Sequence, residues 1–106
     1  MTYNDWMTAT RPKIRGSQNL HDLMPQDVDF FVFLSSSAGV IGARGQANYA
    51  VGNTFQDALA AHRRSKGLKA VSLDLGLILG AGVCLPFFPS LLPTFQSHPL
   101  TIYHRW

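Results

Sequence analysis

The chain has 106 residues, of which 46% are hydrophobic and 14% charged, and its formal net charge is +3. This length allows at most one small domain, and the apolar composition excludes an intrinsically disordered chain. The basic residues are scattered except for Arg63, Arg64 and Lys66, and no aromatic residues interleave with these three. A nucleic-acid-binding surface is therefore disfavoured.

The first predicted element is a helix over residues 12–24. Lys13, Leu20 and Leu23 fall on one face of it with helical spacing, and Pro12 suits the first position of a helix. A proline directly after residue 24 is expected to help end the helix.

A buried strand is predicted next, over residues 29–35. Its apolar run is unbroken from Phe30 to Leu34, which is typical of a strand covered on both faces in a parallel sheet. A loop of small residues follows over 35–45, with glycines spaced G-x-x-G-x-x-G. That spacing differs from the dinucleotide-binding pattern G-x-G-x-x-G, so the loop is interpreted as flexible rather than as a phosphate cradle.

The strongest predicted helix covers residues 47–66, and Gly67 is well placed to end it. A second apolar strand is predicted over residues 70–75. The order helix, strand, helix, strand indicates a parallel sheet flanked by helices, and two strands make only part of a doubly wound α/β domain. The side chains expected to face inward from the long helix are Val51, Phe55, Ala58, Leu59 and His62.

The last third of the chain raises the question of a membrane span. Residues 75–93 carry no charge and approach the length needed to cross a bilayer, but glycines and prolines interrupt them repeatedly. A membrane-associated protein anchored by this segment remains a disfavoured alternative. The single cysteine, Cys84, cannot form an internal disulfide and fits a reducing, cytoplasmic compartment. Neither a basic start nor an apolar run opens the chain, so no signal peptide is predicted.

Ser36, Tyr49 and Asn53 form the most informative group of polar residues. Ser36 directly follows the buried strand, at the sheet edge where α/β proteins bind ligands, and Tyr49 and Asn53 share a face of the long helix. A serine hydroxyl and a phenol can act together on one carbonyl oxygen. A free phenol has a pKa near 10, so it needs a nearby ammonium to become a useful acid, and Lys13 is the candidate. By composition alone, each of these residues would more often be structural.

A metal site is not predicted. The histidines and the cysteine show none of the tight spacings that chelation requires. The residues considered are His21, His62, Cys84, His98 and His104.

Several segments resemble the ketoreductase domains of polyketide synthases, especially those of fungal reducing synthases. Residues 11–21 (RPKIRGSQNLH) resemble their PK-x-x-G-x-x-NLH segment, and residues 29–36 (DFFVFLSS) their DFFV-x-LSS strand. Residues 45–55 (GQANYAVGNTF) are similar to their GQ-x-x-YA-x-x-N-x-F helix start, and residues 71–76 to the strand after it. The resemblance runs from about residue 6 to residue 82.

This resemblance implies a partial Rossmann-like sheet of the short-chain dehydrogenase/reductase type. It also implies NADPH-dependent reduction of a β-ketoacyl group, carried as a phosphopantetheine thioester on an acyl carrier protein within a polyketide synthase. Tyr49 would be the general acid and Ser36 would polarise the keto oxygen. Lys13 would assist Tyr49 and touch the nicotinamide ribose. Asn53 would take the position of the lysine of simpler reductases and, with Lys13 and Tyr49, contribute to cofactor binding.

Two departures from the family pattern divide the chain. The family's glycine-rich NADPH turn is expected upstream of the lysine helix and is not found here, so the N-terminal cofactor-binding half is predicted to be absent. Residues 1–83 are interpreted as the C-terminal part of a ketoreductase domain, and residues 84–106 as a divergent, irregular tail. The chain is then either a reductase piece that works once completed, or a non-catalytic remnant that does not bind NADPH. On either hypothesis the isolated chain is expected to be inactive.

Overall fold

The computed structural model describes residues 1–76 and 103–104. The elements in chain order are α1 (Tyr3–Leu23), β1 (Val32–Ser36), α2 (Ala38–Ile41), α3 (Ala47–Ser65), β2 (Val71–Leu75) and β3 (Tyr103–His104). Both predicted strands and both predicted helices are present, and α2 is a short additional turn within the predicted loop.

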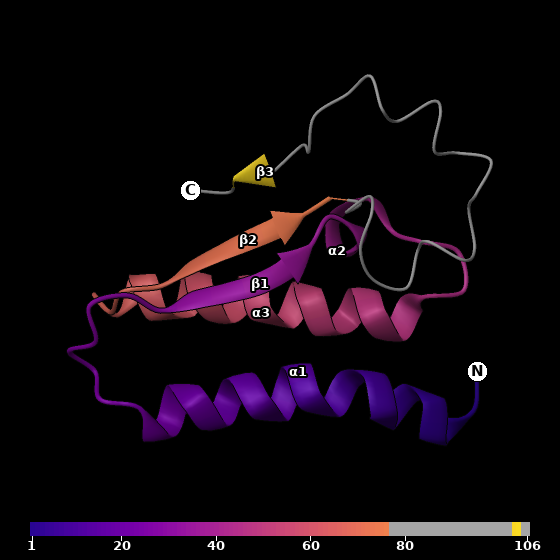
Figure 1. Cartoon of the computed structure of the whole chain (residues 1–106), viewed down its shortest axis with the longest axis horizontal. Helices are drawn as coiled ribbons and strands as arrows, with labels where there is room; N and C mark the ends of the chain where they lie inside the picture. The colour runs from indigo at the N-terminus through magenta and orange to yellow at the C-terminus, as the bar shows by residue number, and fades with distance from the viewer. Residues whose placement is uncertain (77–102, 105–106) are drawn as a thin grey trace, which may run out of the picture.

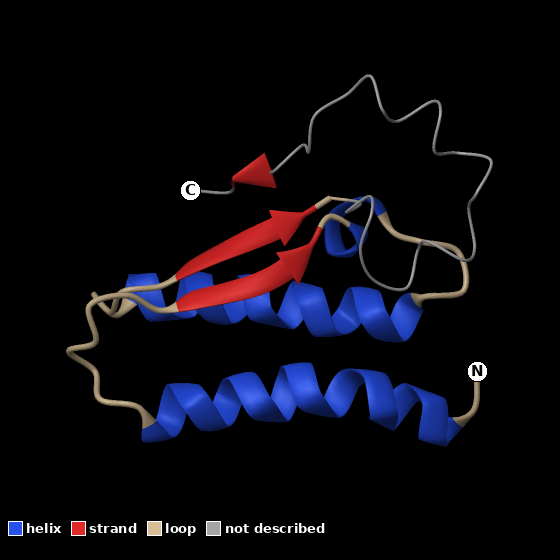
Figure 2. Ribbon diagram, in the orientation of Figure 1, coloured by secondary structure: helices blue, strands red, loops and turns tan. Residues whose placement is uncertain are grey.

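The strands form one sheet in the order β1-β2-β3. β1 and β2 are parallel, with register from Val32 opposite Val71 to Ser36 opposite Leu75, while β3 pairs antiparallel with β2. Both long helices lie on the same side of this sheet and run side by side, with α3 between α1 and the strands (Figures 1 and 2). The predicted class, a partial Rossmann-like parallel sheet flanked by helices, is confirmed.

Helix α1 begins nine residues earlier than predicted, at Tyr3 instead of residue 12. A capping box starts it: Asp5 N donates to the Thr2 hydroxyl at 3.2 Å, and Thr2 N donates to the Asp5 carboxylate at 2.8 Å. Pro12 therefore lies inside the helix, and the prediction that it occupies the first position is wrong. The helix ends at Leu23 because Met24, the residue before a proline, is extended.

Helix α3 matches its predicted range, and Gly67 ends it as expected. Gly67 has a φ of 76°, which a glycine adopts without a steric penalty. Its N–H donates to the Arg64 carbonyl at 2.9 Å, and Leu68 N donates to the Arg63 carbonyl at 3.0 Å. These two bonds form a Schellman motif, which satisfies the last carbonyls of the helix.

The predicted inward stripe of α3 is only partly correct. Leu59 is buried, but Val51 is 40% exposed and Ala58 and His62 are exposed. The residues that α3 does bury are Gly52, Asn53, Leu59, Ala60 and Arg63. This part of the prediction is wrong because α3 packs against α1 through small and polar residues. Such residues do not repeat along the sequence as apolar residues with helical spacing would.

The hydrophobic core is small and lies between α3 and the sheet. Phe33, Leu59 and Ala60 form it, with Phe31, Phe55 and Ala70 packed around them. The other face of β1 is open among the described residues: Val32 is 44% and Leu34 58% exposed. The expectation that β1 is covered on both faces is therefore not met by this part of the chain, because both long helices lie on one side of the sheet.

The membrane question and the tail fall largely outside the described residues. Cys84, His98 and most of residues 75–93 and 84–106 are not described, and the two described tail residues form β3. Among the helices that are described, none is long and apolar enough to cross a membrane.

Candidate active site

The four site residues predicted from the sequence come from three elements. Lys13 lies in the middle of α1, Ser36 is the last residue of β1, and Tyr49 and Asn53 lie in the first turns of α3. β1 and β2 are parallel, so their carboxyl ends meet at one edge of the sheet, where α/β domains place their ligands. Ser36 stands at that edge.

Lys13 and Tyr49 come together from different helices. The Lys13 Nζ lies 5.7 Å from the centroid of the Tyr49 ring. The same Nζ donates a hydrogen bond to the Leu34 carbonyl at 2.9 Å and another to Gln56 Oε1 at 3.0 Å. Tyr49 keeps 39% of its surface exposed, whereas Lys13 is partly buried. The Lys13 ammonium therefore lies beside the Tyr49 ring, and its action on the phenol stays a prediction.

The environment of Lys13 weakens its hold on a proton. Burial lowers the pKa of Lys13, because removal from water disfavours the ammonium, while the nearby Tyr49 and Asp57 act to raise it. A partly desolvated ammonium interacts more strongly with a neighbouring negative charge than one in water does. Any negative charge that develops on the Tyr49 oxygen would benefit from this.

Ser36 is partly buried, and its hydroxyl accepts a hydrogen bond from the Ala38 backbone at 3.3 Å. Within residues 1–76, the Ser36 hydroxyl makes no hydrogen bond with Tyr49. The preceding serine, Ser35, is instead buried and donates to the Asn53 carbonyl at 3.2 Å. Ser35 thus fastens β1 to α3, and Ser36 is left as the serine on the opposite face of the strand.

Asn53 is fully buried, with 0% of its surface exposed. Its Nδ2 donates to the Tyr49 carbonyl at 2.8 Å, one turn earlier in α3, and its Oδ1 is buried without a hydrogen-bond partner. Asn53 therefore supports the helical turn that carries Tyr49. Its catalytic and cofactor-binding roles stay predictions.

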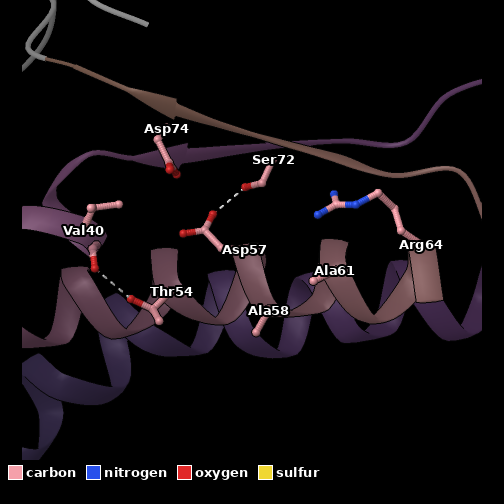
Figure 3. Close-up of a pocket in the computed structure, with 9 residues that line it drawn as sticks. Val40, Thr54, Asp57, Ala58, Ala61, Arg64, Ser72 and Asp74 are labelled. Atoms are coloured by element: carbon pink, nitrogen blue, oxygen red, sulfur yellow. Dashed lines mark hydrogen bonds between the residues drawn. The ribbon is translucent and has the colours of Figure 1, made fainter. Parts of the chain in front are cut away.

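One pocket is separate from these residues. It has a volume of about 490 Å³ and lies between α3, α2 and β2 (Figure 3). The Ser72 hydroxyl donates to Asp57 Oδ1 at 2.6 Å across it, and the Thr54 hydroxyl donates to the Gly39 carbonyl at 3.3 Å. Because none of the four predicted residues lines this pocket, it is not the centre of the candidate chemistry. Its lining residues are Gly39, Val40, Thr54, Asp57, Ala58, Ala61, Arg64, Ser72 and Asp74.

Gln56 and Ser17 extend the contacts of Lys13, although neither was predicted from the sequence as a site residue. Gln56 Nε2 donates to the Ser17 hydroxyl at 3.0 Å, and Gln56 Oε1 accepts from Lys13. Spacing was the available signal: Lys13 and Ser17 are four residues apart on α1, and Gln56 follows Tyr49 by two turns of α3. In the part of the chain that the structure describes, no group of three His, Cys, Asp or Glu side chains could hold a metal ion.

Comparison with known proteins identifies the family to which this sequence belongs. The sequence profile of the KR domain matches residues 1–80. The reducing polyketide synthase FUB1 of Gibberella moniliformis is 59% identical over 83 residues, and the highly reducing polyketide synthase ausV of Aspergillus calidoustus is 60% identical over 82 residues. These matches cover 78% and 77% of this chain and 3% of each relative, so the chain spans a small part of their length.

Solved structures agree. The first ketoreductase of the tylosin polyketide synthase superposes with a TM-score of 0.72 at 36% identity, covering 78% of this chain and 19% of that one. The A-type ketoreductases from a modular polyketide synthase give a TM-score of 0.65 at 44% identity, covering 68% of this chain and 16% of that one. This chain therefore belongs to the KR family, the ketoreductase domains of polyketide synthases, and its fold is part of their short-chain dehydrogenase/reductase fold.

Proposed function

We propose that this chain supplies the catalytic residues of an NADPH-dependent ketoreductase that acts on a β-ketoacyl thioester. The observation that carries the proposal is the approach of the Lys13 ammonium to the Tyr49 ring, 5.7 Å from its centroid, in a chain that matches the KR family. The polyketide synthases among its relatives support an acyl chain carried by an acyl carrier protein as the substrate. The remainder of such a synthase is the proposed partner.

In this reaction a ketone gains a hydride at carbon and a proton at oxygen. The Tyr49 phenol donates the proton, and the Ser36 hydroxyl donates a hydrogen bond to the same oxygen as its negative charge grows. Lys13 stabilises the phenolate that remains, because its ammonium lies beside the Tyr49 ring. Asn53 holds the turn that carries Tyr49 through its bond to the Tyr49 carbonyl.

NADPH, when bound, supplies the hydride. The residues described here fit one end of it: Lys13 offers an ammonium and Tyr49 a phenol for the hydroxyls of the nicotinamide ribose. Among the described residues they do not offer a cradle for the pyrophosphate, because the glycines over residues 39–45, which precede α3, have the spacing G-x-x-G-x-x-G and not the dinucleotide-binding spacing G-x-G-x-x-G. The proposal therefore requires the pyrophosphate site to come from elsewhere in the reductase.

The main alternative is a non-catalytic chain. The small core and the open face of β1, where Val32 is 44% and Leu34 58% exposed, favour a unit that packs against further polypeptide. We expect the isolated chain to associate through such surfaces and to reduce no ketone. NADPH-dependent turnover by the chain alone, lost in Tyr49→Phe, would contradict that expectation.

An exchange experiment separates the two readings. The 83 matched residues of the Gibberella synthase would be replaced by those of this chain, and NADPH consumption with a β-ketoacyl thioester would be followed. We expect the exchanged enzyme to reduce the thioester and the Tyr49→Phe version to lose at least about a hundredfold in rate, the usual scale for a general acid. A folded exchanged enzyme that is inactive would overturn the proposal in favour of the non-catalytic reading.

A further inference from the structure

We propose that Gln56 is a positioning residue. Its side chain binds both Ser17 and the Lys13 ammonium, and it thereby holds the ammonium beside the Tyr49 ring. This inference rests on the proposed function in so far as Lys13 is taken to act on Tyr49. Gln56 directly follows the segment over residues 45–55 that resembles the family, and within residues 1–76 its side chain makes no hydrogen bond with Tyr49. Its role would be exercised entirely through Lys13.

The hydrogen bonds form a short chain between two helices. Gln56, on α3, accepts from Lys13 Nζ at 3.0 Å and donates to the Ser17 hydroxyl at 3.0 Å. Lys13 and Ser17 are one turn apart on α1. One glutamine side chain on α3 thereby binds two successive turns of α1.

The chemistry of the three groups fixes the orientation of the Gln56 amide. An ammonium can only donate, so the amide oxygen must face Lys13 and the amide nitrogen must find another acceptor. Ser17 supplies that acceptor, and it is only 4% exposed, which limits competition from water. The Lys13 ammonium therefore determines which end of the Gln56 amide faces it, and the buried Ser17 hydroxyl accepts from the other end.

Gly52 opens the path along which Lys13 reaches this position. A methyl group at Gly52 would lie 3.1 Å from both Cβ and Cδ of Lys13, closer than ordinary van der Waals contact. The alkyl part of Lys13 thus crosses α3 directly over Gly52, one turn before Gln56. The side chain is confined along its length as well as at its tip.

A third anchor comes from the sheet. The Leu34 carbonyl of β1 accepts from the same Nζ at 2.9 Å, so α1, α3 and β1 converge on one nitrogen. Two acceptors in different directions define the ammonium position far better than one does. Without Gln56, the Leu34 carbonyl alone would leave Nζ free to swing away from the Tyr49 ring, which lies 5.7 Å from it.

The titration of Lys13 tests this in the full 106-residue chain. The sequence has three lysines, Lys13, Lys66 and Lys69, so the ε-carbon NMR signals of labelled lysine are few, and the signal missing in Lys13→Arg assigns the first. Lys66 and Lys69 are exposed and serve as internal controls. The titrating groups that act on Lys13 are Tyr49 and Asp57, and neither is altered in the variants.

We expect Gln56→Leu to lower the titration midpoint of Lys13 below that of the wild type, because the ammonium loses an acceptor in a partly desolvated position. Gln56→Glu should raise it, and Ser17→Ala should lower it by less than Gln56→Leu does. Gln18→Leu is the matched control: Gln18 pairs with Asp22 on α1, away from Lys13, and should leave the midpoint unchanged.

Two results would overturn the proposal. One is an unchanged Lys13 midpoint in Gln56→Leu, Gln56→Glu and Ser17→Ala while the chain stays folded. The other is loss of folding in all three, which would make Gln56 a residue of general stability. If only Gln56→Leu fails to fold, the other two variants decide.

The exchanged synthase gives the functional readout. There Gln56→Leu should reduce kcat more than it changes KM, with recovery in Gln56→Glu, because a misplaced ammonium affects the proton transfer and not substrate binding. An inactive parent enzyme would contradict the proposed function alone, since the lysine titration is measured independently of turnover. A shifted titration with unchanged kcat would overturn the claim that Gln56 acts on Tyr49 through Lys13.

Discussion

Helix α3 has two interfaces of different chemistry. Toward the strands, which we call the sheet interface, it contributes Leu59 and Ala60 to the core around Phe33. Polar residues of the strands are buried there too, and Ser35 and Ser72 donate hydrogen bonds to α3. The apolar core of the described residues is nevertheless confined to this side.

Toward α1, which we call the helix interface, hydrogen bonds replace the apolar core. The only buried residues of α1 are Thr10 and Ser17, while its Leu20 and Leu23 are 53% and 82% exposed. Apolar burial is strong but has no direction, whereas hydrogen bonds are individually weak and strongly directional. The difference teaches that the sheet interface holds the fold and the helix interface sets the position of the Lys13 side chain.

The largest expected effect is at the sheet interface. Phe33 is 4% exposed, so Phe33→Ala should lower the free energy of unfolding by about 3–5 kcal/mol through lost burial and a cavity. Phe30, which is 78% exposed, is the matched control, and Phe30→Ala should change stability by less than about 0.5 kcal/mol. Urea unfolding followed by circular dichroism measures both, and equal effects would contradict the assignment of the core.

A second substitution tests the residue that joins the two interfaces. The Arg63 side chain is 1% exposed, stacks 3.9 Å from the centroid of the Phe31 ring, donates to the Lys69 carbonyl at 3.2 Å and contacts His21 Nδ1 at 2.9 Å. Arg63→Met would remove the donor from two part-buried acceptors, and we expect a loss of about 1–3 kcal/mol in unfolding free energy.

The neighbouring Arg64 is exposed and offers the control. It makes a single hydrogen bond of 3.3 Å to the Ala70 carbonyl, so Arg64→Met should cost no more than about 0.5 kcal/mol. If Arg63→Met is equally mild, α1 is held mainly by contacts other than this one, and the two interfaces are less coupled than the structure indicates.

Alanine substitutions at two glycines, one at the helix interface and one outside it, should differ by a smaller amount in their effect on stability. An alanine at Gly16 of α1 would meet nothing within 4 Å, so Gly16→Ala should stabilise the chain by about 0.5–1 kcal/mol through helix propensity. At Gly52 the same methyl group would press on Lys13 at 3.1 Å, so the gain should be cancelled or reversed. Thermal unfolding of the two variants gives the comparison, and equal stabilisation would show that Lys13 is not confined over Gly52.

The two interfaces also differ in how well the sequence predicts them. The sheet interface was largely predictable, because an apolar run marks β1 and Gly67 marks the end of α3. The helix interface was not, because hydrogen bonds between Gln56, Ser17 and Lys13 leave no periodic apolar pattern to detect. A Thr-x-x-Asp capping box at residues 2–5 did signal the true start of α1, but Pro12 was the more conspicuous residue.

The candidate site was likewise predictable only in part from the sequence. The sequence resemblance identified Lys13, Ser36, Tyr49 and Asn53 as individual residues, and the structure brings Lys13 to Tyr49. It could not reveal that Asn53 is fully buried, since a polar residue at a helix start is usually exposed. Burial of this kind depends on α1 and β1 closing over α3 from different sides, which local spacing does not encode.

The last prediction concerns pH and the helix interface alone. Because burial lowers the pKa of Lys13 in the folded chain, its protonated form costs stability at neutral pH. That cost is relieved as the pH rises from the folded-state pKa toward the ordinary value of a lysine, since the unfolded chain binds more protons in this window. The free energy of unfolding of the wild type should therefore rise with pH relative to that of Lys13→Met, and the difference should be flat below the window.

Urea unfolding at a series of pH values measures this difference, and Lys66→Met, at an exposed lysine, is the control that should show no such trend. The unfolding free energy of the wild type relative to Lys13→Met could instead fall with rising pH. That result would mean that attraction to Tyr49 and Asp57 outweighs burial, since both act to raise the pKa of Lys13. Lys13 would then be held by charge, and the neutral acceptors Gln56 and Leu34 would matter less than their short distances indicate. A rising difference means that burial outweighs this attraction, and the hydrogen bonds to the Gln56 and Leu34 oxygens are then what hold the ammonium beside the Tyr49 ring.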